Sequence, residues 1–236
     1  MAYTEPSCWT WTLAALPGAL LLFAYALLFA LVEIEIEGKD GWAMNLPTWF
    51  RRKPWYARVY GFLLSGKPLT GYHSLIFLIS FLSFHLGLAF GQPWSWGLEA
   101  RLLASYFVWV ATWDFLWFVL NPAFGWARFR KGEVWWHNGR WLGRLPIDYV
   151  NALWMSFLVA ALPWLVRGNS RHLRHHGVYV VTMLVLIVAT TLAAPLYHRW
   201  YSHMRRPGSD ERLGSAIPPS AAASDYGERD AQDKDG

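Results

Sequence analysis

Five stretches of mostly apolar residues recur along this chain, and each is close to the length of a membrane-spanning helix. They occupy residues 9–32, 72–90, 98–120, 149–166 and 177–197. A transmembrane helix needs about 20 consecutive apolar residues. Only 16% of the residues are charged, whereas soluble domains average about 25%. The sequence therefore predicts an all-α integral membrane protein, a bundle of about five transmembrane helices with two long cytoplasmic loops.

The first stretch is interpreted as a helix that stays in the protein and not as a cleaved signal peptide. Residues 1–9 contain no Lys or Arg, and no small-residue cleavage site follows the apolar run. Residues 1–206 are then one transmembrane helical domain. From residue 207 the chain is rich in Gly, Ser, Ala, Pro and alternating charges, a composition typical of disorder. We expect 207–236 to be a disordered cytoplasmic tail.

Basic residues concentrate in the two loops that follow the first and third apolar stretches. These residues are Lys39, Arg51, Arg52, Lys53, Arg58 and Lys67 in one loop, and Arg128, Arg130, Lys131, Arg140 and Arg144 in the other. Because Lys and Arg accumulate on the cytoplasmic side, the N-terminus is predicted outside and the C-terminus in the cytoplasm of a multi-pass protein of the cell membrane. Arg167, Arg171 and Arg174 would lie outside and argue against this orientation, but they are fewer.

The net charge of +5 belongs to these same loops, where Trp residues are interleaved with the basic ones. In a membrane protein this pattern indicates an interfacial aromatic belt and contact with anionic lipid headgroups, so membrane lipids are expected partners and nucleic acid is not.

Ionisable residues recur at one depth of the predicted bundle. Glu33, Glu35 and Glu37 end the first stretch, Asp114 lies inside the third and Asp148 opens the fourth. Charged side chains at membrane depth are costly, so they indicate a functional site. Glu33, Glu35 and Glu37 share one face if the backbone is extended, whereas Glu33 and Glu37 are neighbours if the helix continues. Whether Glu35 faces the pocket stays open.

We predict that these groups form a cytoplasm-facing polar pocket that binds a divalent metal of unknown identity. The candidate metal ligands are Glu33, Glu37, Asp114 and His137, and the candidate acid–base groups are Asp114, His137 and Asp148. His73 and Asn121 would contact these groups without being metal ligands themselves. The alternatives are glutamates that face water, a His73 that only anchors at the interface, and a structural pair between Asp114 and an arginine such as Arg128 or Arg144.

Other sites are less favoured by the sequence. His172, His175 and His176 match an H-x-x-H-H spacing, and His198 and His203 follow, but the last predicted helix separates the two groups by a membrane thickness. His85 has no intramembrane histidine at its level, which argues against haem. The single cysteine, Cys8, excludes an intramolecular disulfide, and no serine-hydrolase elbow, H-E-x-x-H motif or phosphate loop is present.

Four motifs carry a resemblance to a known family. They are EIEIEGxxGWAxxLPTW at 33–49, LTGYH at 69–73, DFLWFVLNP at 114–122 and WH at 136–137. With them, roughly residues 20–155 resemble a family of small polytopic membrane proteins of bacteria and archaea. The resemblance implies a shared polytopic fold and carries no activity with it.

Two functions of different class follow from the pocket. As an enzyme, the protein would act on a lipid or isoprenoid whose anionic headgroup meets Arg51, Arg52, Arg128 and Arg130. The alternative is a non-enzymatic subunit or scaffold of a membrane complex, whose loops dock another membrane protein. An ion-coupled transporter is a third hypothesis, carried by Asp114 alone and weakened by the absence of internal repeats.

Overall fold

The computed structural model describes residues 8–137, 140–168 and 170–205. Its helices are α1 Cys8–Glu37, α2 Trp55–Leu63, α3 Gly71–Phe84, α4 Leu86–Ala89, α5 Trp96–Leu120, α6 Gly125–Arg128, a 3₁₀ turn Trp135–His137, α7 Ile147–Arg167 and α8 Arg171–Met204. Its strands are the short β1 Phe50–Arg51, β2 Leu69–Thr70, β3 Trp141–Leu142 and β4 Leu145–Pro146. The predicted disordered tail, 207–236, lies outside the described residues.

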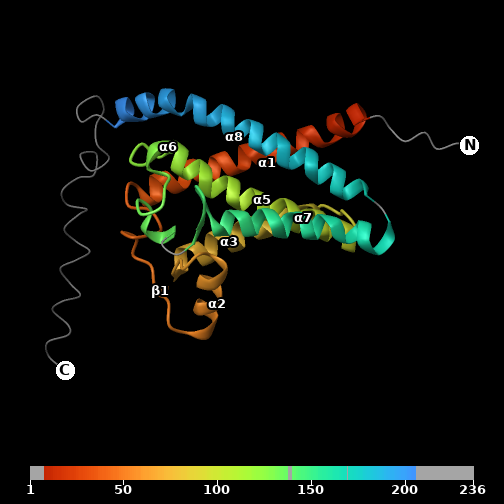
Figure 1. The fold of residues 1–236 in the computed structure, drawn as a ribbon, viewed down its shortest axis with the longest axis horizontal. Helices are drawn as coiled ribbons and strands as arrows, with labels where there is room; N and C mark the ends of the chain where they lie inside the picture. The colour runs from red at the N-terminus through yellow and green to blue at the C-terminus, as the bar shows by residue number, and fades with distance from the viewer. Residues whose placement is uncertain (1–7, 138–139, 169, 206–236) are drawn as a thin grey trace, which may run out of the picture. The chain divides into compact units, whose positions relative to one another are not determined.

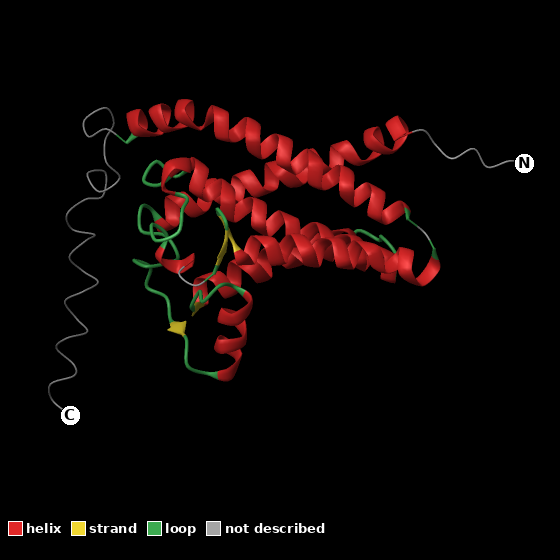
Figure 2. Ribbon diagram, in the orientation of Figure 1, coloured by secondary structure: helices red, strands yellow, loops and turns green. Residues whose placement is uncertain are grey.

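The described chain is mostly helical, and four of its helices are long and apolar enough to cross a membrane (Figure 2). They are Ala15–Glu37 within α1, Trp96–Leu120, Ile147–Val166 and Arg171–Met204. The sequence predicted a helical membrane protein from five apolar stretches, and four of these coincide with the long helices. At the level of a mostly helical membrane protein the prediction is confirmed.

The predicted span 72–90 is not one continuous helix. α3 contains 14 residues, or about 21 Å at 1.5 Å per residue, which is less than the roughly 30 Å of a bilayer core. It ends at His85, whose Nδ1 hydrogen-bonds the carbonyl of Phe81 at 2.8 Å and whose Nε2 lies 3.3 Å from Glu99 Oε1. His85 alone separates α3 from the short α4, and its contact with Glu99 links this break to the start of α5.

α5 is the central helix and packs along α1 and α7 (Figure 1). Small residues allow the close approach of α1, because Ala26 and Ala30 are fully buried. Aromatic rings fill the rest of the interface: Trp109 of α5 stacks on Tyr25 with 4.9 Å between ring centroids. Along the helix, Ala26, Ala30, Glu33 and Glu37 follow at intervals of four, three and four residues. The buried face of α1 therefore continues into the two glutamates.

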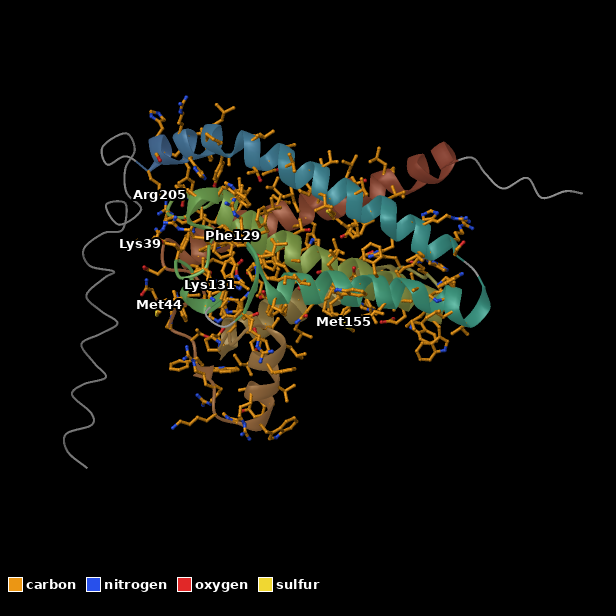
Figure 3. All side chains as sticks on the ribbon, in the orientation of Figure 1. Lys39, Met44, Phe129, Lys131, Met155 and Arg205 are labelled. Carbon is orange, nitrogen blue, oxygen red and sulfur yellow. The ribbon has the colours of Figure 1, made fainter. Side chains whose placement is uncertain are left out.

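The loops between the long helices fold back onto their ends and contain the only strands in the described part of the chain. β1 pairs with β2 through Phe50↔Thr70 and Arg51↔Leu69, and β3 pairs with β4 through Trp141↔Pro146 and Leu142↔Leu145. The two loops also meet each other, since Trp135 Nε1 donates to the carbonyl of Asp40 at 3.3 Å. Figure 3 shows Lys39 and Lys131, one from each loop, toward the same end of the helices, with Met155 farther along α7.

The described residues beyond His198 belong to a separate compact unit and continue α8 to Met204. Within this unit the guanidinium of Arg205 lies over the ring of Tyr201, 4.9 Å from its centroid.

Candidate functional site

Two buried glutamates and a histidine form a compact group where α1 ends. His73 Nε2 lies 3.7 Å from Glu33 Oε1 and 3.5 Å from Glu37 Oε1. One ligand atom from each residue lies within 4.8 Å of the others. Among the side chains that the structure describes, this is the one group of three His, Cys, Asp or Glu residues close enough to hold a metal ion. α1 stays helical through Glu37, so Glu35 points elsewhere and is exposed.

A strained turn closes over this group. Gly38 and Gly41 have positive φ, and so do Trp42 at 44° and Ala43 at 52°, a conformation that non-glycine residues rarely adopt. The turn brings the N–H of Ala43 to Glu37 Oε1, where it donates at 2.5 Å. It also stacks the indole of Trp42 on His73 at 3.8 Å between ring centroids. Strain at such positions persists only where surrounding contacts enforce it.

The imidazole of His73 is oriented from its other side. Thr70 caps α3 by accepting a hydrogen bond from the N–H of His73 at 3.0 Å, and its hydroxyl also lies 2.8 Å from His73 Nδ1. Nε2 is thereby directed at the glutamates. Histidines that ligate metals are typically held in this way through the second ring nitrogen. His73 thus stands beside the glutamates as a third ligand candidate, whereas the sequence analysis expected it to contact the ligands without being one itself.

Lys67 is the central cation of a second buried group. Its Nζ lies 3.0 Å from Asp148 Oδ2 and 3.5 Å from Asp114 Oδ1. Burial alone would lower the pKa of Lys67, but the two aspartates outweigh it and raise the pKa above its usual value. Lys67 is therefore positively charged at neutral pH. Its ammonium also lies over the ring of Trp42 at 4.7 Å, so Trp42 separates this group from His73.

His137 lies between the same two aspartates and is fully buried. Its Nε2 is 3.4 Å from Asp114 Oδ2 and its Nδ1 is 3.4 Å from Asp148 Oδ2. Both contacts are long for hydrogen bonds. Burial and the nearby charge of Lys67 lower the pKa of His137, although Asp114 acts in the opposite direction. Tyr149 completes the group by donating a hydrogen bond to Asp114.

A cavity of about 700 Å³ leads to both groups. Its charged and polar wall includes Glu33, Lys67, His73, Asp114, Asp148 and Tyr149. The remaining wall is mostly apolar and comes from α2, α3, α5 and α7, including Leu63, Phe77, Phe107, Val110, Trp154 and Met155. The arrangement suits a molecule with an apolar body and one polar, reacting end.

The predicted residues Asp114, His137 and Asp148 are thus brought together, and Glu33 and Glu37 form a group with His73. The β3–β4 hairpin lies in the chain directly before Asp148. Asn121 is buried but has a different role: its Nδ2 donates to the carbonyl of Gly38 at 2.8 Å and its Oδ1 accepts from Ala123 N–H. It fastens the turn after α1 to the end of α5.

The predicted arginines lie elsewhere. Arg128 donates to the carbonyl of Ala123 and pairs with Glu133, and Arg130 also pairs with Glu133. Arg51 lies over the ring of Trp49. Arg52 lines a different pocket, so none of the four borders the cavity. The alternative of a structural ion pair between Asp114 and Arg128 or Arg144 is wrong, because the cation that pairs with Asp114 is Lys67. Arg144 is exposed.

Lys67 and Tyr149 were missed by the sequence analysis. The only signal for Lys67 was its place in the turn Gly66-Lys67-Pro68, which says nothing of its partners. The other histidines are dispersed: His176 contacts Ser156 Oγ at 3.0 Å and His198 contacts the carbonyl of Val119 at 3.0 Å.

No protein-family model, curated protein or solved structure matches this chain. The resemblance to a family of small polytopic membrane proteins stays a prediction, and the function has to be argued from the geometry of the site.

Proposed function

We propose that this protein is a membrane enzyme that acts on a lipid or isoprenoid substrate and uses a divalent metal. One observation carries the proposal: a largely apolar cavity of about 700 Å³ ends at two adjoining buried groups of ionisable residues. Buried charges at membrane depth are costly, and their gathering at the end of an apolar cavity is typical of a site for chemistry on an amphipathic molecule.

The metal would bind Glu33, Glu37 and His73. Carboxylate and imidazole groups both bind zinc, and catalytic zinc sites use three protein ligands and keep a further position open for water or substrate. The Thr70 contact to His73 Nδ1 supports this assignment. A metal there would polarise a substrate oxygen or lower the pKa of bound water.

The second group would position the substrate and move protons. Lys67, positively charged between Asp114 and Asp148, would attract an anionic part of the substrate. His137 is neutral at neutral pH because its pKa is lowered, so it is able to accept a proton. Asp114 and Tyr149 would orient the imidazole and hold a proton at the cavity wall.

We further propose that the site lies near the cytoplasmic side of a five-crossing bundle, with α3 and α4 together forming the second crossing. The basic loops that surround the site support this orientation, which places the N-terminus outside and the C-terminus in the cytoplasm.

Metal content tests the proposal directly. Detergent-purified wild type would be compared by elemental mass spectrometry with Glu37→Gln and His73→Gln, after zinc, manganese or iron has been supplied. Glu35→Gln is the matched control, because Glu35 lies on the same helix but is exposed. We expect near-stoichiometric metal in wild type and Glu35→Gln, and loss of metal in the other two variants that still elute as folded protein.

A wild type that binds no metal under any of these conditions would refute the metal-dependent function. It would shift the interpretation to a non-enzymatic subunit of a membrane complex. If metal is bound, conversion of a lipid extract by wild type but not by His137→Gln, followed by mass spectrometry, would test the enzymatic part.

A further inference from the structure

A second pocket with strongly basic walls lies on the other side of Lys67. It has a volume of about 420 Å³. We call it the basic pocket. Its polar and charged wall residues are Arg52, Arg58, Ser65, Lys67 and Arg140. α2 and the turn after it contribute most of the lining, whereas Arg52 comes from the segment before α2 and Arg140 from the second loop, directly before β3.

The charge of the basic pocket is not balanced by its own walls. None of the described side chains that line it is acidic. Lys67 already faces Asp114 and Asp148, whereas the three arginines add positive charge with no counter-ion on the lining. Arginine guanidinium groups match the geometry of phosphate oxygens better than any other side chain does. The pocket is therefore complementary to a phosphate-like anion.

Ser65 gives independent support. Its side chain is only 4% exposed, and its hydroxyl has no hydrogen-bond partner among the described residues. Buried hydroxyl groups are normally paired, so an orphaned one that lines a pocket indicates a missing ligand. The residue also has a φ of 54°, in the left-handed region, followed by Gly66 at 86°. The turn holds the hydroxyl in place despite this strain.

Arg140 is positioned by an aromatic ring. Its guanidinium lies over Phe62 of α2 at 5.2 Å from the ring centroid. A cation–π contact of this kind restricts the position of the guanidinium while leaving its N–H groups available to an anion.

The geometry points to a binding site for the phosphate headgroup of an amphipathic molecule, with the basic pocket holding the phosphate and the apolar cavity holding the hydrocarbon part. Lys67 lines both spaces and so marks where the head and the apolar body would join. The lipid part of this inference rests on the proposed function, because it takes the cavity to be the place of the substrate's body. The inference also moves the headgroup site away from Arg51, Arg128 and Arg130.

Binding to the full-length protein in a non-ionic detergent, with EDTA present, tests the inference by isothermal titration calorimetry. The probes are farnesyl phosphate, farnesol and inorganic phosphate. Each of Arg58→Gln and Arg140→Gln removes one guanidinium from the pocket, and Ser65→Ala removes the hydroxyl. Arg130→Gln is the matched control, because it removes the same charge from a residue that pairs with Glu133 outside the pocket.

We expect farnesyl phosphate to bind wild type and Arg130→Gln with equal affinity. It should bind Arg58→Gln and Arg140→Gln about tenfold more weakly, because each variant loses one charge-assisted contact. Ser65→Ala should show a smaller loss, and the affinity for farnesol should not change in any variant. All these variants alter exposed arginines or remove a single atom, so they should fold, which size-exclusion chromatography verifies.

Two results would overturn the inference. One is that Arg58→Gln and Arg140→Gln bind farnesyl phosphate with the affinity of wild type. The other is that wild type binds farnesol as tightly as farnesyl phosphate. Inorganic phosphate that binds as tightly as farnesyl phosphate, with the same dependence on Arg58 and Arg140, would overturn the lipid assignment in favour of free phosphate. EDTA removes metal, so this experiment tests phosphate binding independently of the metal. If the protein binds no metal in any experiment but binds farnesyl phosphate through Arg58 and Arg140, the metal-dependent function fails and this inference is still supported.

Discussion

Replacing Lys67 by methionine removes the only cation that contacts Asp114 and Asp148 among the described residues, while keeping a flexible chain of similar length. The Lys67 side chain is 5% exposed and that of Asp148 is 6% exposed, whereas that of Asp114 is 22% exposed. In the variant, Asp148 is left as a buried carboxylate without its cation. Asp114 keeps some contact with water and the hydrogen bond from Tyr149.

The expected cost follows from these exposures. Removing one partner of a buried ion pair typically destabilises a protein by about 3–5 kcal/mol, because the remaining charge is uncompensated. Since Asp148 is as buried as Lys67, we expect the full effect from this pair and little more from Asp114. For a chain of this size, 1 kcal/mol shifts Tm by roughly 2–4 °C, so Lys67→Met should unfold roughly 6–20 °C below wild type.

Thermal unfolding of purified protein in detergent measures this difference. Lys39→Met is the control, because Lys39 is exposed and its loss removes the same charge. Asp148→Asn in the Lys67→Met background removes the uncompensated carboxylate and should recover a large part of the lost stability. If Lys67→Met unfolds within 2 °C of Lys39→Met, or if the added Asp148→Asn lowers Tm further, the charge network is not what stabilises the site.

Two further predictions concern the residues around this network. The pKa of His137 is lowered in the folded protein but is about 6.5 in the unfolded chain, so the unfolded state binds the extra proton first and stability is lost as the pH falls below about 6.5. Tm should fall less steeply between pH 7 and pH 5 in His137→Gln than in wild type, and equal slopes would contradict the assignment. Gly41 and Gly38 both have positive φ, but a Cβ at Gly41 would lie 2.5 Å from the ring of Trp136, whereas one at Gly38 meets nothing within 4 Å. Gly41→Ala should therefore cost about 1–3 kcal/mol more than Gly38→Ala in thermal unfolding, and equal losses would refute the close packing of this turn.

The helices were predictable where local composition decides them. Hydropathy over about 20 residues identified the four long helices because burial in a bilayer depends on each segment alone. It did not predict the break at His85 within residues 72–90, which divides this stretch into α3 and α4. At that point the imidazole of His85 contacts Glu99, a residue of the next long helix, and no local pattern records such a contact.

The face of α1 was predictable in part. The sequence left open whether residues 33–37 are extended, which would place Glu35 on the same face as Glu33 and Glu37, or helical, which turns Glu35 away from them. The structure is helical through Glu37. Ala26 and Ala30 precede them on the same face, and this continuous stripe of small residues was the signal that Glu35 points away.

Lys67 could not have been assigned from the chain alone. It was counted as one basic loop residue among several, and its partners Asp114 and Asp148 lie on two distant helices. Its position depends on how the loop folds back through the β1–β2 pair and on the hydrogen bond from Trp42 Nε1 to the carbonyl of Pro68 at 3.0 Å. Pairing of this kind is set by tertiary structure, whereas amphipathic periodicity is set by sequence.

The proposed metal and the proposed phosphate are compatible with each other in charge. Lys67 supplies one positive charge against Asp114 and Asp148, and the described ion pairs of Glu33 and Glu37 involve only His73, a group that carries no fixed charge. A divalent cation would balance the glutamates, which otherwise repel each other. An anionic headgroup would be repelled by four carboxylates, but the basic pocket lies on the side of Lys67 lined by arginines and by none of the described acidic residues. Lys67 would then separate a bound phosphate from the aspartates, and the part of the substrate next to the phosphate would be the part that reaches the acidic groups.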